Sequence, residues 1–166
     1  MLIRTEIGID AAGIERLLKR CIDPAQEAER VSQLREQGLL TLGVVATDDE
    51  GQVLGYAAFS PVTLNGEDKG WVLLSSLAVD RDQAQQLSES ALVREALDTL
   101  NEFGYSAVVA YQPYACLPEL GFGDAQSLTY RTPQGLGEQQ LQVCPLANGP
   151  VEGVSGELLF SAPFYG

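Results

Sequence analysis

The sequence contains no histidine, and it has only three cysteines, Cys21, Cys116 and Cys144. The missing imidazole excludes nucleophilic catalysis by a Ser-His or Cys-His pair, and it leaves no Cys/His cluster that would bind zinc. The cysteines are odd in number and widely spaced, which is unlike a disulfide framework and typical of reduced thiols in a cytosol. Carboxylates, tyrosines, thiols, hydroxyls and backbone groups are what remains for chemistry.

Basic residues are also scarce: 10 Lys and Arg stand against 23 Asp and Glu, for a formal net charge of −13. Binding to nucleic acid or to an anionic membrane depends on clustered cations, so this composition argues against both kinds of partner. No apolar run approaches the roughly 18 residues of a membrane span, and the first residues lack a signal-peptide pattern. We therefore expect a cytoplasmic protein. The 166 residues, 45% of them hydrophobic, predict one domain, 1–166, with its own core.

The first half of the chain predicts a strand, two helices and three strands. Leu2 and Ile3 start the strand, and Asp10 caps a helix whose buried face is Ile14, Leu17, Leu18, Cys21 and Ile22. Asp23-Pro24 caps a second helix over Ala25 to Gln37, which stops at Gly38. Residues 39–47 and 52–64 predict a hairpin. After the Asn65-Gly66 turn and the polar stretch 66–70, residues 71–79 (WVLLSSLAV) predict a third strand.

The second half predicts a longer helix, a strand and several short elements. Helical spacing of Leu92, Val93, Ala96, Leu97 and Leu100 predicts a helix that ends at Gly104, followed by a strand over 106–111. The buried face does not extend back to Leu87, so we expect a loop up to Ser88 with Ser88 or Ser90 as the cap. An earlier start, with Asp82 as cap and Gln85 in a capping box, is the alternative. This order predicts an α+β (mixed α/β) fold in which helices cover a largely antiparallel sheet.

Several segments, taken in order, resemble a known family. They are MLIRTE at the start, GYAAFSPVTLNG and LSSLAV in the middle, SALVREAL in the third helix, LGF at Leu120 to Phe122, and the tail GVSGELLFSAPFYG. The chain resembles the GNAT superfamily of N-acetyltransferases, and more narrowly its small bacterial YhbS-like branch, over nearly its whole length. The resemblance implies a GNAT-like fold with a mostly antiparallel central sheet that splays between its fourth and fifth strands.

The resemblance also implies a cofactor and where it lies. The pantetheine arm of acetyl-CoA or CoA would lie between the strand that ends in Leu77, Ala78 and Val79 and the strand Ala107 to Tyr111. Backbone groups matching Leu77 and Val79 would pair with the pantetheine amides, and an N–H there would polarise the thioester carbonyl. Ser90, at the start of the third helix, is a further candidate cofactor-binding residue. The alternative is that Leu77 to Val79 is only a buried strand segment.

The loop that binds the pyrophosphate in the family departs from its pattern here. The signature Q/R-x-x-G-x-G/A falls on Ala84, Leu87 and Glu89, so all three signature positions differ. Two added Cβ groups would stand where the backbone needs a positive φ, and a carboxylate would face the diphosphate. At about 5 Å and an effective dielectric constant near 20, two unit charges repel by roughly 3 kcal/mol. We therefore expect weak CoA binding, which replacing Leu87 and Glu89 by glycine would tighten. Arg81 and Arg94 are the nearby cations.

The catalytic groups depart from the family pattern as well. Leu117 occupies the position of the family tyrosine that reprotonates the CoA thiolate, and leucine donates no proton. Tyr114 is a displaced candidate for this acid, with a packing role as the alternative. Cys116 beside it is a candidate nucleophile, with an inert apolar thiol as the alternative. The candidate bases are the carboxylates Glu67, Asp68 and Glu119, with Ser75 or Ser76 positioning a water.

Two functions follow from these observations. The first is an acyl-CoA-dependent N-acyltransferase in which a small neutral amine attacks the thioester directly. The second is a GNAT-fold protein that has lost catalysis and serves as a ligand-binding or protein-interaction module. Use of the same site for a ligand other than CoA is a third possibility. The sequence names no metal site, no substrate, no partner and no oligomeric state.

Overall fold

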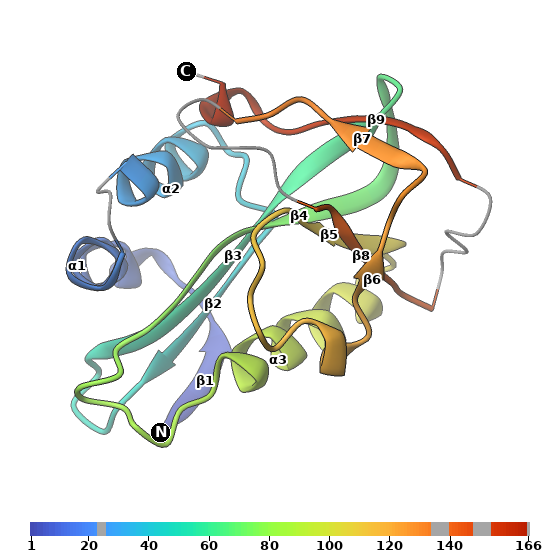
Figure 1. Cartoon of the computed structure of the whole chain (residues 1–166). Coiled ribbons are helices and arrows are strands. Elements are labelled where there is room, and N and C mark those ends of the chain that lie inside the picture. The colour runs from blue at the N-terminus through green and yellow to red at the C-terminus, as the bar shows by residue number, and fades with distance from the viewer. Residues whose placement is uncertain (23–25, 134–139, 148–153, 166) are drawn as a thin grey trace.

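A long hairpin forms the centre of the computed structural model, which describes residues 1–22, 26–133, 140–147 and 154–165 (Figure 1). Its arms are β3 (Val53–Leu64) and β4 (Glu67–Val79). Asn65 and Gly66 both have positive φ, 52° and 83°, as a two-residue type I′ turn requires. This tight turn keeps Leu64 opposite Glu67, so β4 includes the polar residues from Glu67 onward. The expectation that this strand begins at Trp71 is therefore wrong.

The other strands extend the sheet on both sides of the hairpin. The order is β1-β2-β3-β4-β5-β8-β6, and β9 pairs with both β3 and β7. All these pairings are antiparallel except β4 with β5 and β7 with β9, which are parallel. The bounds are β1 Leu2–Thr5, β2 Leu42–Thr47, β5 Ala107–Ala110, β6 Gly123–Asp124, β7 Leu128–Tyr130, β8 Gln142–Pro145 and β9 Gly156–Leu159.

Helices cover both faces of the sheet, as Figure 1 shows. The helices α1 (Ala11–Cys21) and α2 (Gln26–Glu36) pack on one face, where α1 buries Ile14, Leu17 and Leu18. The helix α3 (Glu89–Glu102) packs on the other face through Leu92, Val93, Ala96 and Leu100. Three short 3₁₀ turns complete the fold: η1 Gly8–Asp10, η2 Pro118–Leu120 and η3 Ala162–Phe164. The predicted mixed α/β fold with a splayed sheet is confirmed.

Several predicted helix details need correction. Cys21, the last residue of α1, is exposed rather than buried, Ile22 is half-buried, and Leu97 is only partly buried. Asp10 precedes α1, but its carboxylate accepts hydrogen bonds from Arg4 and from the N–H of Ile7 and caps no N–H of the helix. The predicted cap at Asp23-Pro24 and the start at Ala25 lie outside the described residues. Ser88 caps α3, as predicted, because its Oγ accepts the N–H of Ala91 at 3.1 Å.

Gly55 of β3 leaves room for a side chain from the loop before α3. A Cβ on Gly55 would lie 2.6 Å from Leu87 Cδ2 and 3.0 Å from Leu92 Cδ1. Leu87 is buried in the same apolar cluster as Leu92 and Ala96. The missing side chain of one strand residue therefore fixes where the loop packs.

Substitution of Gly55 tests this packing. We expect Gly55→Ala to lower the free energy of unfolding by about 1–3 kcal/mol through overpacking. Leu87→Ala lowers it by about 2–3 kcal/mol through cavity formation. Urea unfolding of the double variant should show a loss smaller than the sum, since the added methyl group fills space that Leu87 vacates. The control is Gly123→Ala, whose Cβ meets no atom within 4 Å. Strict additivity would contradict the proposed contact.

Candidate functional site

The sheet opens where β4 leaves β5. Their parallel pairing covers Trp71 to Leu73 of β4 and ends where Leu73 faces Val109. Beyond this point β4 continues to Val79 paired only with β3. The predicted splay between the fourth and fifth strands thus begins at Leu74.

The splay leaves backbone groups of β4 without a strand partner. The N–H of Asp80 donates to the carbonyl oxygen of Leu54 in β3 at 2.8 Å. Because backbone groups alternate sides along an antiparallel strand, those of Ala78 also face β3, and those of Leu77 and Val79 face away from it. In the described part of the chain, no group lies within hydrogen-bond distance of the N–H of Leu77 or Val79. These two N–H groups are available to a ligand.

An irregularity in β4 at Ser75 turns the following side chains. The β3–β4 register shifts between Ala58 and Phe59, so Ser75 is an extra residue in β4. Leu74 and Leu77 consequently both face α3, whereas Ser76 and Ala78 face α1 and α2. The bulged Ser75 hydroxyl hydrogen-bonds to that of Ser60 at 2.5 Å, which satisfies both buried groups.

Ser76 thereby reaches a buried carboxylate on α2. Its hydroxyl donates to Glu27 Oε2 at 3.2 Å, and the amide of Gln112 donates to Glu27 Oε1 at 3.2 Å. The Glu27 residue is only 8% exposed. Burial raises the pKa of Glu27, and the hydrogen bonds from Gln112 and Ser76 and the charge of Arg30 offset part of this rise. A carboxylate with a raised pKa beside the splay is suited to accept a proton.

Gln112 connects Glu27 to two tyrosines. Its Nε2 also donates to the hydroxyl of Tyr111 at 3.2 Å, and its Oε1 accepts the hydroxyl of Tyr114 at 3.0 Å. Burial raises the pKa of Tyr114 well above its ordinary value, so its phenol stays protonated at neutral pH. The structure thus brings Tyr114 into one hydrogen-bonded cluster with Glu27.

The loop from Asp80 to Ser88 is held by polar and apolar contacts. Asp80 Oδ2 accepts a hydrogen bond from Arg20 Nε at 2.9 Å. Asp80 Oδ1 accepts hydrogen bonds from the backbone N–H groups of Asp82 and Gln83. Ala84 and Leu87 are buried in the core beneath the loop. No residue from 80 to 89 has a positive φ, so the expected conflict between these side chains and a left-handed backbone does not arise. Leu87→Gly would therefore open a cavity in the core, so a change in CoA affinity could not be assigned to the loop backbone. Of the two substitutions expected to tighten CoA binding, only the one at Glu89 is a usable test.

A pocket of about 410 Å³ lies at the first turn of α3. Its lining includes Arg81, Glu89, Ser90, Cys116 and Glu119. Arg81 forms an ion pair with Glu89, and the hydroxyl of Ser90 donates to Glu119 Oε1 at 2.6 Å. Burial raises the pKa of the Cys116 thiol, which disfavours the nucleophilic thiolate. The pocket presents one cation and two carboxylates to any ligand.

The remaining predicted groups lie elsewhere. Leu117 is fully buried in the core on the α3 side of the sheet, so a tyrosine at this position would have to displace core residues. Glu67 and Asp68 lie at the β3–β4 turn, at the opposite end of β4 from Val79; Glu67 pairs with Lys69 at 2.8 Å and Asp68 accepts the N–H of Gly70. Of the three predicted bases, only Glu119 lines the pocket at α3.

The sequence reasoning missed Glu27 and Gln112. Glu27 precedes Val31 and Leu34 by four and seven residues, so all three share the buried face of α2. A carboxylate on the apolar face of a predicted helix was the available signal. No comparable signal marks Gln112, because its position depends on where the chain turns after β5.

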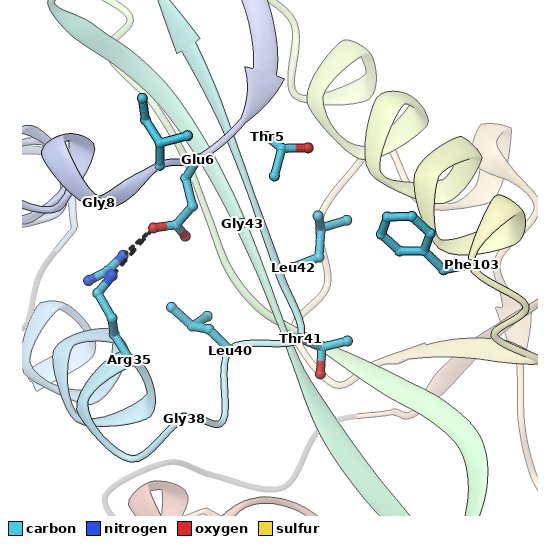
Figure 2. Close-up of a pocket in the computed structure, with 11 residues that line it drawn as sticks. Thr5, Glu6, Gly8, Arg35, Gly38, Leu40, Thr41, Leu42, Gly43 and Phe103 are labelled. Carbon is cyan, nitrogen blue, oxygen red and sulfur yellow. Dashed lines mark hydrogen bonds and ion pairs between the residues drawn. The ribbon is translucent and has the colours of Figure 1, made fainter.

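A second pocket, of about 420 Å³, lies near the C-terminal ends of α2 and α3. Figure 2 shows Glu6 and Arg35 pointing toward each other at this pocket, with Phe103 across from them. Arg35 Nη2 donates to Glu6 Oε2 at 3.0 Å, and the buried Tyr56 hydroxyl donates to Glu6 Oε1 at 2.6 Å. These hydrogen bonds connect Glu6, which follows β1, to α2 and β3. We therefore assign the three residues a structural role.

The described residues form neither a metal-binding cluster nor a membrane-spanning helix. No group of three or more His, Cys, Asp or Glu side chains in the described ranges is arranged to hold a metal ion. None of the helices described is both long enough and apolar enough to cross a bilayer.

Comparison with known proteins agrees with this geometry. No protein-family model matches the chain. It is 50% identical to the N-acetyltransferase YhbS of Escherichia coli K12 over 156 residues, which cover 94% of this chain and 93% of that protein. The crystal structure of Escherichia coli YhbS in complex with CoA superposes with a TM-score of 0.88 at 48% identity, covering 98% of this chain and 91% of that one. A GNAT family acetyltransferase from Brucella melitensis in complex with acetyl-CoA gives a TM-score of 0.78 at 31% identity, covering 98% and 97%.

These TM-scores show that the chain has the same fold as the two CoA-bound acetyltransferases. The chain belongs to the GNAT family of N-acetyltransferases. The resemblance to the YhbS-like branch is confirmed.

Asp80 allows a pH test of how the loop is anchored. The hydrogen bond from Arg20 is the main cause that lowers the pKa of Asp80. A carboxylate with a lowered pKa in the folded state stabilises that state above its unfolded pKa, about 3.9, and this contribution is lost as the pH falls through the folded value. Asp80→Asn should therefore unfold at lower urea concentration than the unchanged chain at pH 7, and the difference should shrink below about pH 4. The control Asp98→Asn, at an exposed position on α3, should change stability by less than about 0.5 kcal/mol. An equal difference at pH 3 and pH 7 would disprove the role of Asp80.

Proposed function

We propose that the chain is an acyl-CoA-dependent N-acyltransferase that acts on a small amine, in the cytoplasm, as a single domain spanning 1–166. The observation that carries this proposal is the unpaired backbone edge of Leu77 and Val79 at the splay. An amide-containing pantetheine arm can pair with such an edge whatever the side chains are. Close similarity to a CoA-bound GNAT acetyltransferase supports the same assignment.

The residues of this chain suit the pantetheine arm of CoA better than its diphosphate. The backbone edge of Leu77 to Val79 suits the pantetheine arm. Near the start of α3, where the diphosphate would lie, Arg81 is engaged by Glu89, and Ser90 by Glu119. An exposed ion pair of this kind is worth at most about 1 kcal/mol, so Arg81 can leave Glu89 for a phosphate. The Glu89 carboxylate would remain close to that phosphate.

The mechanism assigned to the residues is direct transfer. Acetyl-CoA supplies an activated acyl group, whose carbon forms a bond to the amine nitrogen as its bond to sulfur breaks. Glu27 accepts the proton that the amine nitrogen loses, and Ser76 and Gln112 hold its carboxylate in place. The N–H of Val79 or Leu77 stabilises the oxyanion that develops on the acyl group. The proton that the thiolate needs comes from water, because Leu117 supplies none and the Tyr114 hydroxyl donates to Gln112.

A second candidate is a GNAT-fold module that binds a ligand without catalysis. It is favoured by Leu117, which is fully buried where the family acid would stand, and by the carboxylate of Glu89 at the diphosphate site. Turnover decides between the two candidates, since both permit binding.

Calorimetric titration with acetyl-CoA tests the cofactor site. We expect weak binding to the unchanged chain and up to about tenfold tighter binding to Glu89→Gln at low salt, because a like charge beside the diphosphate is removed. The gain should shrink as salt is added. Glu95→Gln removes a charge from an exposed position further along α3 and should change affinity less than twofold. Low-micromolar native affinity with no gain for Glu89→Gln would mean that another group, such as Arg81, neutralises the phosphates. Absence of any binding would reject the acyl-CoA proposal.

Substitution of Glu27 tests the base. Glu27→Gln should lower kcat/KM by about 10²-fold and remove the rising limb of the pH profile. That limb should lie above the pH expected for an ordinary glutamate, because burial raises the pKa of Glu27. Glu29→Gln, an exposed neighbour on α2, is the matched control.

The same assays assign the acid. Tyr114→Phe should cost less than about threefold in rate, since water can reprotonate the thiolate. A hundredfold loss would show that Tyr114 is the catalytic phenol.

For the base, an unchanged pH profile in Glu27→Gln would show that Glu27 does not accept the proton of the amine.

A further inference from the structure

Arg30 of α2 is a buried cation whose Nε finds no hydrogen-bond acceptor among the described residues. The residue is 9% exposed. Its guanidinium carbon lies 4.9 Å from the centre of the Phe164 ring, so the aromatic face of η3 covers one side of the cation. In the described part of the chain no carboxylate lies within 4.0 Å of it. A buried guanidinium N–H without an acceptor is costly unless a ligand supplies one.

Arg30 lies beside Glu27, the carboxylate proposed to take the proton of the amine substrate. Glu27 lies three residues earlier, on the same side of α2, and is itself buried. The charge of Arg30 also acts on Tyr111, whose hydroxyl accepts from Gln112, the same amide that donates to Glu27. Figure 1 shows α2 beside the C-terminal turn that carries Phe164. Arg30 therefore lies next to the carboxylate assigned as the base.

We propose that Arg30 binds a carboxylate of the acceptor, and that the substrate is an amine that also carries a carboxylate. This inference rests on the proposed function. The amine of such a substrate lies toward Glu27, and its carboxylate lies toward the guanidinium. Side chains three residues apart on a helix are separated by about 5–6 Å at Cβ, which suits an amino acid with one to three carbons between its charged groups.

A carboxylate fits this site better than a phosphate. Arg30 is a single cation, and Glu27 adds a negative charge one helical turn away. A doubly charged phosphate would be repelled by Glu27 and only half neutralised by Arg30. A carboxylate carries one charge and matches the planar fork of guanidinium donors.

Ligand-observed NMR on the full chain tests the proposal without requiring turnover. The probes are the α-amino acids, β-alanine and γ-aminobutyrate, each paired with its carboxamide, together with phosphoethanolamine. We expect at least one amino carboxylate to bind, about tenfold or more tighter than its carboxamide. Arg30→Lys keeps the charge and loses the fork, and should remove most of this preference while leaving carboxamide binding unchanged. Arg30→Met should remove it entirely.

The controls separate binding from folding and from the function itself. Arg16→Lys, at an exposed position on α1, should leave the preference intact. Equal binding of carboxylates and carboxamides, an unchanged preference in a folded Arg30→Lys, absence of any bound carboxylate, or tighter binding of phosphoethanolamine would each overturn the inference. If carboxylates bind through Arg30 but no acyl group is transferred, the proposed function is rejected and the carboxylate site at Arg30 is supported. If acyl groups are transferred to amines that lack a carboxylate, and substitution of Arg30 has no effect, the proposed function is supported and the carboxylate site is rejected.

Discussion

The loss of pairing between β4 and β5 beyond Leu73 is the constraint on which the rest of the site depends. It leaves the backbone edge of Leu77 and Val79 without a strand partner while β3 still holds β4 in the sheet. The bulge at Ser75 lies at the same point and turns Ser76 toward α2. The open backbone edge and the polar contact to Glu27 therefore arise in the same part of β4.

The loop after β4 is held by its own contacts, and none of residues 80–89 has a positive φ. Asp80 fixes the start of the loop through Arg20 and two backbone N–H groups, and Leu87 fixes its end by packing beside Gly55. Core packing and the hydrogen bonds of Asp80 together set the path of this loop. The loop is followed by a pocket at the first turn of α3 whose lining includes the carboxylates of Glu89 and Glu119.

Local sequence patterns predicted most of the fold. Periodicity identified α1 and α3, residue composition identified the β2–β3 hairpin, and the Asn65-Gly66 pair identified the turn before β4. Ser88, one of the two expected caps of α3, is the cap. Helical spacing places Glu27 and Arg30 on the buried face of α2, but it could not predict which groups would contact these two charges. The sequence analysis gave neither residue a role, because their contacts with β4, Gln112 and Phe164 join segments that are distant in sequence. Positions after β5 were also unpredictable, because the short turn around Pro118 sets which of Tyr114 and Leu117 enters the core.

The central claim is that the splayed edge of β4 holds the cofactor through its backbone. Amide hydrogen exchange with and without CoA, resolved by residue, measures this directly. The account predicts that the N–H groups of Leu77 and Val79 exchange faster than that of Ala78 in the free protein, and that CoA slows them by about tenfold or more. Exchange at Leu77 and Val79 that is already slow, or that CoA leaves unchanged while protecting other amides, would contradict it.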